Sequence, residues 1–352
     1  MKQGKTITQL AMEIERQQAA KQDFIADTRL VRMAPTELGN GVRVEIDEVG
    51  SFGIRETAHR QIGAKTGIPA KYYDRMLTEN PSLLATNVNA WFAAEPERRM
   101  IRTLDGHARA LLTDRYQRID NEHIAEVVLP ILAETPGIRI ASAEITERRL
   151  YIKAVNEQVH DEVKVGDVVE AGVMITNSEI GHGAVSISPL VHRLVCLNGM
   201  VAPDQKYRRN HVGARADAAD PVYAMLSDEA LRADDKAILL KVRDVVRAAL
   251  DRAMFGQTVE RMRASTEGER LKDPVAGIER LATKMGILEG EKPSVLRHLI
   301  EGGDLSRWGM LNAVTRAAHD VDSYDRSTEL EEIGGRILDL KVSEWRELAA
   351  AA

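Results

Sequence analysis

The only cysteine of the chain, Cys196, lies in a segment that also holds two of its nine histidines, His182 and His192. A cysteine beside a histidine can form a nucleophilic pair or bind a transition metal. The residues around Cys196 instead predict a β-strand, in which residues four apart are separated by about 13 Å. We therefore expect His192 and Cys196 to be structural. His182, which stands between two glycines, and His192 are possible ligand contacts.

Other motifs with a known chemistry do not occur in the sequence. The stretch "GAKTG" at 63–67 lacks the glycine spacing of a phosphate-binding loop, and there is no dinucleotide fingerprint. We therefore expect no cofactor, no metal and no catalytic residues, and we do not expect an enzyme. One alternative stays open, a metal-dependent hydrolase that acts on nucleic acid or nucleotides. Its ligands would come from His182, His192, Asp320 and Asp322, although these residues form no paired-ligand motif.

Positive charge gathers in three segments, 55–75, 98–118 and 206–215. Of the 48 basic and 54 acidic residues, 20 and 26 follow residue 215, so the excess of acid lies in the C-terminal part. Basic side chains with interleaved tyrosines suit single-stranded nucleic acid, because cations follow the phosphates and rings stack on bases. The candidate nucleic-acid-binding residues are Arg98, Arg99, Arg102, Arg109, Arg115, Arg118, Tyr116, Lys206, Tyr207, Arg208, Arg209 and Arg215.

The spacing of apolar residues predicts an α+β protein. We expect an antiparallel sheet with helices in the N-terminal two thirds and a mostly α-helical C-terminal region. The expected regions are an N-terminal helix or arm (1–40), an α+β domain (41–215) and a helical region that packs on it (216–352). The expected elements include a helix over about 7–25, strand pairs over 41–55 and 98–114, a helix over 121–135, and a helix capped by Ser327.

The hydropathy pattern of the chain bears on the cellular compartment of the protein. No apolar run approaches the roughly 20 residues that a membrane span needs, and the N-terminal residues show no apolar signal core. A single cysteine fits a reducing compartment. We expect a cytoplasmic protein with no membrane partner.

Four blocks together resemble a phage- and plasmid-associated family that is catalogued as a domain of unknown function. They are "TGIPAKYYDRML" (66–77), "RALLTDRYQRIDN" (109–121), "NSEIGHGAVSISPLVHRLVCLNGM" (177–200) and "SRWGMLNAVTRAAHDVDSYDRSTELEEIGGRIL" (306–338). The resemblance implies a protein of phages, prophages or conjugative elements, encoded near functions of DNA replication or recombination. It implies no catalytic residues.

Charge and resemblance together favour a DNA-binding protein of a phage or mobile element. It would bind single-stranded DNA, assist annealing, recombination or replication, and could be a homo-oligomer. A phage protein that binds a host protein is a further alternative.

Overall fold

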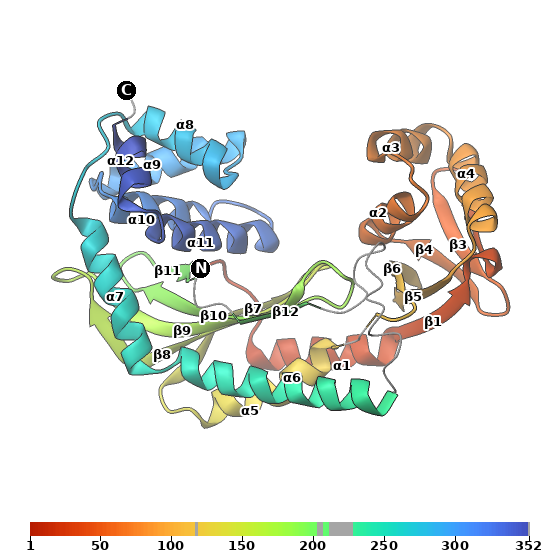
Figure 1. Cartoon of the computed structure of the whole chain (residues 1–352), viewed down its shortest axis with the longest axis horizontal. Coiled ribbons are helices and arrows are strands. Elements are labelled where there is room, and N and C mark those ends of the chain that lie inside the picture. Colours follow the sequence, from red (N-terminus) through yellow and green to blue (C-terminus); the bar gives the residue numbers. More distant parts are fainter. Residues whose placement is uncertain (117–118, 203–206, 211–227, 351–352) are drawn as a thin grey trace.

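The chain forms an open C, seen in the computed structural model of Figure 1. The structure describes residues 1–116, 119–202, 207–210 and 228–350. One arm of the C is an N-terminal domain, the other is a set of C-terminal helices, and a central sheet with its covering helices joins them. The α+β class predicted from the sequence is confirmed. In the described part of the chain, no helix is both long enough and apolar enough to cross a membrane.

The N-terminal domain is a six-stranded sheet in the order β1-β5-β6-β4-β3-β2, in which only β4 and β6 run parallel. Three helices cover one of its faces (Figure 1). The elements are β1 (Lys21–Asp27), β2 (Val31–Pro35), β3 (Val42–Ile46), β4 (Gly50–Ile54), α2 (Glu56–Lys65), α3 (Ala70–Glu79), α4 (Pro81–Ala94), β5 (Arg98–Leu104) and β6 (His107–Thr113).

The first helix is shorter than the sequence predicts. Helix α1 (Ile7–Ala20) starts with a capping box of Thr6 and Gln9. It ends five residues before the expected end at Ile25, because the chain continues as β1 and pairs with β5. Strands β1 and β2 therefore belong to the N-terminal sheet, whereas α1 itself packs on the central sheet.

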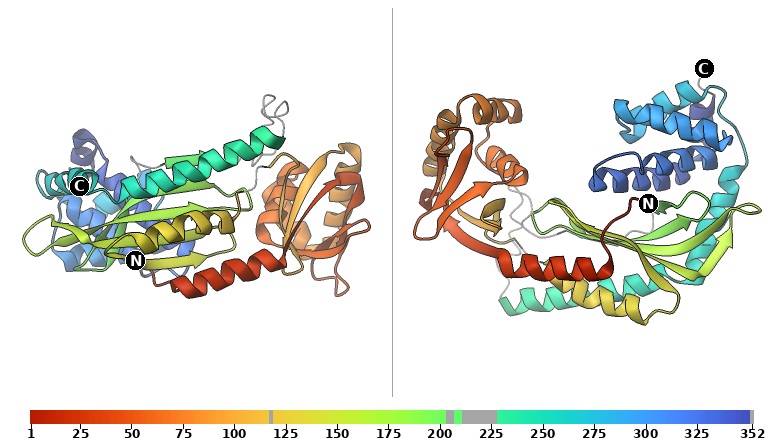
Figure 2. Two further views of the ribbon diagram at one scale, coloured as in Figure 1. Left: turned by 90° about the horizontal axis from the view of Figure 1, so that it is seen from below. Right: turned by 180° about the vertical axis from the view of Figure 1, so that it is seen from behind.

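The central sheet is antiparallel, in the order β11-β10-β9-β8-β7, with β12 paired to the far half of β10. It consists of β7 (Ile138–Ile145), β8 (Leu150–Glu162), β9 (Val168–Asn177), β10 (Ala184–Arg193), β11 (Asn198–Val201) and β12 (Tyr207–Asn210). Helices α1, α5 (Asn121–Glu134) and α6 (Asp228–Ala249) cover its outer face, seen from below in Figure 2.

The C-terminal helices cover the opposite, inner face of the central sheet. They are α7 (Arg252–Thr266), α8 (Pro274–Met285), α9 (Lys292–Gly302), α10 (Arg307–Ala317), α11 (Tyr324–Leu338) and α12 (Val342–Ala349). Helix α11 starts with Ser323 as its N-cap rather than at the expected Ser327. Ser327 instead lies buried inside the helix.

A buried ion pair joins the inner face of the central sheet to α11. Lys153 of β8 lies 2.6 Å from Glu331, and neither side chain has any exposed surface. The ammonium group also donates to Thr328 and stands 4.8 Å from the ring centre of Tyr324. The two layers are thus held together by charge as well as by apolar packing.

Candidate nucleic-acid interface

Arg102, on β5, was expected to bind phosphate but lies in the interior. Its side chain has no exposed surface, and its Nε donates to Asp23 at 2.8 Å. It also donates to Asp120 and to the backbone carbonyl of Glu179, each at 2.8 Å. Two carboxylates and a carbonyl therefore occupy the guanidinium, so the prediction that Arg102 contacts nucleic acid is wrong.

The partners of Arg102 belong to a larger cluster between the two sheets. We call it the interior charge network; it consists of Lys21, Asp23, Arg102, Arg109, Asp120 and Glu179. Arg109 lies 2.7 Å from Glu179 and is buried, and Asp120 is shared with Lys21 at 2.7 Å. Burial opposes the charge of Asp120, but Arg102 and Lys21 outweigh it and hold the pKa of Asp120 far below its usual range.

The other predicted residues of β5 and β6 divide between core and surface. Arg99 is buried against Glu97, and Tyr116 is buried with its hydroxyl donating to the Ser178 carbonyl at 3.2 Å. Contrary to the prediction, these two residues, like Arg109, are therefore not available to phosphates or bases. Arg98 and Arg115 are exposed.

The third basic segment, 206–215, is only partly described. Lys206 and Arg215 lie outside the described residues, as does the side chain of Arg209. Arg118, at the end of the second segment, also lies outside them. Tyr207 is half-buried and packs on the outer-face core, so it does not present the free ring that stacking requires. Arg208 points to the other face and is exposed. Of the described part of this segment, Arg208 alone offers a cation to solvent.

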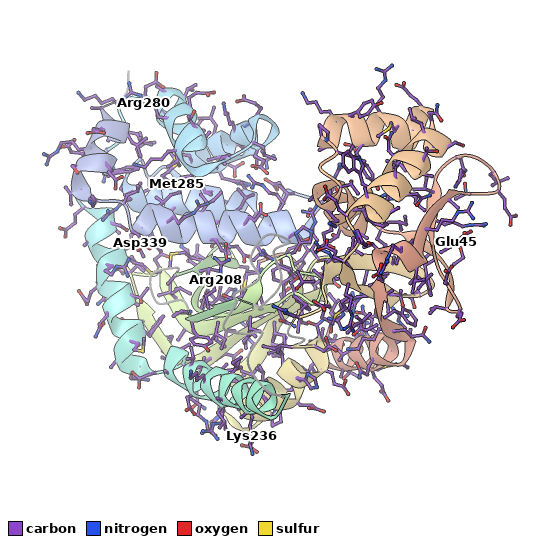
Figure 3. The ribbon with its side chains drawn as sticks, turned by 45° about the vertical axis from the view of Figure 1, so that its right-hand side comes forward. Glu45, Arg208, Lys236, Arg280, Met285 and Asp339 are labelled. Carbon is purple, nitrogen blue, oxygen red and sulfur yellow. The ribbon has the colours of Figure 1, made fainter. Side chains whose placement is uncertain are left out.

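Arg208 belongs to a row of side chains on the inner face of the central sheet. It lies opposite Ser186, which lies opposite Thr176, which lies opposite Tyr151. Directly opposed residues of antiparallel strands project from the same face. Figure 3 shows Arg208 over this sheet, below the C-terminal helices. Within the described chain, the buried hydroxyl of Ser186 has no hydrogen-bond partner.

Two further arginines stand at the other end of this row, where the sheet meets α2. Arg149 donates to the backbone carbonyl of His182 at 2.7 Å. Arg148 is exposed and lies 3.7 Å from Glu56 of α2. We call Arg148, Arg149 and Arg208 the inner arginines. Sequence reasoning missed Arg148 and Arg149, although a pair of arginines directly before a predicted strand was a usable signal.

His182 connects the turn before β10 to the N-terminal domain. Its Nε2 lies 2.9 Å from the hydroxyl of Thr57 on α2. Partial burial of the imidazole, with help from Arg148 and Arg149, lowers the pKa of His182, so the ring is neutral near pH 7. The rest of the side chain is exposed next to the inner arginines, which leaves a ligand contact open to this residue.

His192 and Cys196 do not meet, as expected, but the reason differs from the prediction. Strand β10 ends at Arg193, and a turn with Leu197 at φ 52° leads into β11. His192 is buried with its Nδ1 3.1 Å from Glu170, and Cys196 accepts a hydrogen bond from Arg193 at 3.2 Å. Cys196 therefore lies in a hairpin turn rather than on the expected continuous strand.

The residues of the alternative hydrolase site are not brought together. Asp320 lies 2.8 Å from His298, while His182 and His192 have the separate partners described above. Over the described ranges, no three His, Cys, Asp or Glu side chains form a group suited to a metal ion.

A family model described as a domain of unknown function, DUF932, matches residues 110–332. The chain belongs to the DUF932 family. The match covers well over half of the chain and includes the whole central sheet, the inner arginines and the first part of α11. No curated protein and no solved structure matches the chain. The resemblance to a family of unknown function is thus confirmed, and the association of DUF932 proteins with phages and plasmids stays a prediction.

Proposed function

We propose that this DUF932 protein binds single-stranded nucleic acid through the inner arginines. The observation that carries the proposal is Arg208, an exposed arginine without an ion pair to any described residue, on the inner face of the central sheet. Arg208 and Tyr151 are three strand spacings apart across the sheet, a distance of about 14 Å. Arg149 stands just before β8 at that end of the row. Ser186, Thr176 and Tyr151 between these ends are buried, so the phosphate contacts along this path would come from the arginines at its two ends.

The carboxylates near this path decide how much positive charge remains. Glu56 lies near Arg148, and Asp325 accepts hydrogen bonds from Tyr151 at 2.7 Å and from Thr146 at 3.0 Å. Arg208 has no such neighbour among the residues described. We therefore expect Arg208 to be the strongest phosphate contact and Arg148 to be the weaker one.

A single strand suits this surface better than a duplex. The path leads from the exposed Arg208 on an edge strand to Arg149, which is half-buried and held by the carbonyl of His182. Duplex DNA is stiff over about 150 base pairs, whereas a single strand bends freely. The buried tyrosines leave little base stacking, so phosphate contacts would supply most of the affinity. A role in annealing, recombination or replication is the part of the proposal that rests on the family resemblance.

A binding titration tests the proposal. Anisotropy of a fluorescein-labelled oligonucleotide of mixed sequence is measured at low salt with the wild type and with the double variant Arg148→Gln/Arg208→Gln. We expect the variant to bind about tenfold more weakly, as the loss of two phosphate contacts predicts, with a salt slope smaller by about 1.4. Glutamine keeps most of each side-chain stem, so packing changes little.

The matched control is Arg32→Gln/Arg98→Gln, which removes the same charge from exposed positions on the N-terminal sheet. Arg98, a candidate from the sequence, pairs with Asp27 at the end of the β1–β5 pair that lies away from α1 and the central sheet, so it is not part of the proposed path. We expect its affinity to stay within about twofold of the wild type, since distant charges are screened over roughly 10 Å. Equal weakening by both double variants would contradict a defined path. No binding by the wild type at micromolar concentration would reject the function itself.

A further inference from the structure

A groove runs between α1 and α5 on the outer face of the molecule. It has a volume of about 390 Å³ and is lined by Ala11, Ile14, Glu15, Gln18, Glu122, Ala125, Glu126, Leu129 and Pro130. A cavity of about 150 Å³ already holds a benzene ring, so this groove has room for two or more aliphatic side chains. Figure 2 shows α1 and α5 side by side, on the opposite side of the central sheet from the C-terminal helices.

The floor of the groove is apolar and its rim is acidic. Ile14 and Ala125 are buried in the floor, and Leu129 is half-buried. Glu15 and Glu126 are exposed on the rim. Glu15, Glu122 and Glu126 form no ion pair or hydrogen bond with other described residues, and no basic side chain lines the groove. The rim therefore carries three uncompensated negative charges.

A proline adds a backbone acceptor to the same place. Pro130 stands inside α5, four residues after Glu126. Proline has no backbone N–H, so the Glu126 carbonyl loses its helical hydrogen bond. Both residues line the groove.

We infer that the groove docks a cationic amphipathic helix of a partner protein. A third helix laid between two helices places apolar side chains at three- and four-residue spacing into the floor. Lysine or arginine residues on its flanks would meet Glu15, Glu122 and Glu126. The lining runs from Ala11 to Gln18 on α1 and from Glu122 to Pro130 on α5, about 12 Å along each helix, which matches about two turns of a partner helix. The groove faces away from the inner arginines, so nucleic acid and partner can bind together.

The test uses the full chain and a designed probe, a fluorescein-labelled helical peptide of leucine and lysine with one apolar face. We expect saturable binding to the wild type. For Glu122→Lys/Glu126→Lys we expect affinity to fall at least about tenfold, which corresponds to about 1.4 kcal/mol. The control Glu134→Lys changes charge on the same helix outside the groove, and we expect less than about a twofold effect from its screened charge.

A second pair of variants tests the apolar floor without changing charge. Ala11→Trp places an indole on a residue that lines the groove, whereas Met12→Trp adds the same ring at the neighbouring exposed position. We expect only Ala11→Trp to block the probe. Circular dichroism and thermal unfolding show that each variant is folded.

Three results would overturn the inference. They are no saturable binding of the probe, equal binding of a peptide with the same composition but no apolar face, and equal loss of binding in the groove and control variants. Oligonucleotide binding by the same variants is measured in parallel. Because the two surfaces are separate, a failed peptide titration leaves the nucleic-acid proposal standing, and the reverse also holds.

Discussion

At the scale of single residues, Arg102 shows why a count of local charges misjudges a site. Seven residues of the segment 98–118 were candidates, because the segment has only two acids of its own. The carboxylates that neutralise Arg102 come from Asp23 and Asp120, of which the first is 79 positions away. Such partners follow from the fold alone, so the sequence predicted a basic surface where the molecule has an interior network.

Replacing Arg102 tests its structural role. In Arg102→Met the side-chain volume is nearly kept, but Asp23 and Asp120 lose their shared cation inside the protein. We expect the free energy of unfolding to fall by about 3–5 kcal/mol, the usual cost of breaking a buried ion pair from one side. Urea unfolding followed by circular dichroism measures the change.

Arg98 provides the comparison from the same strand. It is exposed and has no ion pair within the described chain, so we expect Arg98→Met to change stability by less than about 0.5 kcal/mol. Similar losses for both variants would mean that Arg102 is not held as the structure shows.

His59 predicts how stability depends on pH. Its Nδ1 lies 2.9 Å from the hydroxyl of buried Tyr73, and burial, with a smaller effect of Arg60, lowers the pKa of His59 from 6.5 to about 4. Between these values the unfolded chain takes up a proton that the folded protein does not bind. Stability must therefore fall as the pH drops from 6.5 toward 4.

The variant His59→Gln removes this proton uptake and keeps a hydrogen-bonding group. Between pH 7 and pH 5 we expect the variant to lose about 2 kcal/mol less stability than the wild type. Unfolding titrations at the two pH values measure the difference. An equal loss of stability in both proteins between pH 7 and pH 5 would show that His59 is not buried as a neutral ring.

At the scale of elements, the sequence predicted those turns and helices that depend on residues close together in the chain. The β5–β6 hairpin turns at Asp105 and Gly106, both at positive φ, as the Asp-Gly pair indicates. The helix expected over 121–135 is α5, but its N-cap Asp120 gives no side-chain cap hydrogen bond. That carboxylate is engaged by Arg102 and Lys21 instead. The predicted end of the first helix was wrong, because the residues after Ala20 form β1, and the pairing of β1 with β5 overrides their helical propensity.

Two glycine substitutions should have opposite signs. Gly106 has φ 72°, a conformation that costs an L residue about 1 kcal/mol or more, so Gly106→Ala should destabilise the protein. Gly302, in the last turn of α9, has an ordinary φ and open space around its Cα. We expect Gly302→Ala to stabilise the protein by about 0.4–1 kcal/mol. Thermal unfolding compares the two variants, and changes of the same sign in their unfolding temperatures would contradict the backbone geometry.

At the scale of the whole molecule, the sequence predicted the fold class but neither the number of sheets nor their partners. A single α+β domain was expected over 41–215, whereas this range contributes to two sheets. Pairs such as β1 with β5 and β4 with β6 join strands that are distant along the chain, and alternation within one strand does not identify its neighbour. The helical C-terminal region was predicted because helical periodicity is local.

The pair of Lys153 and Glu331 links the central sheet to α11, so its replacement tests the assembly of the layers. We expect Lys153→Met alone to cost about 3–5 kcal/mol, because Glu331 stays buried without its cation. Adding Glu331→Leu removes that carboxylate, and we expect the double variant to regain most of the loss. A double-mutant cycle in urea measures the coupling, and additive losses would contradict the buried contact.

The central claim, that nucleic acid follows the inner arginines, is tested most directly by protection from an arginine-selective dicarbonyl reagent. Modification is measured by mass spectrometry with and without a saturating oligonucleotide. We predict that the oligonucleotide protects Arg208 and Arg148, while the exposed Arg32 and Arg98 react at an unchanged rate. Protection of Arg32 and Arg98 with full reactivity at Arg208 would contradict the account.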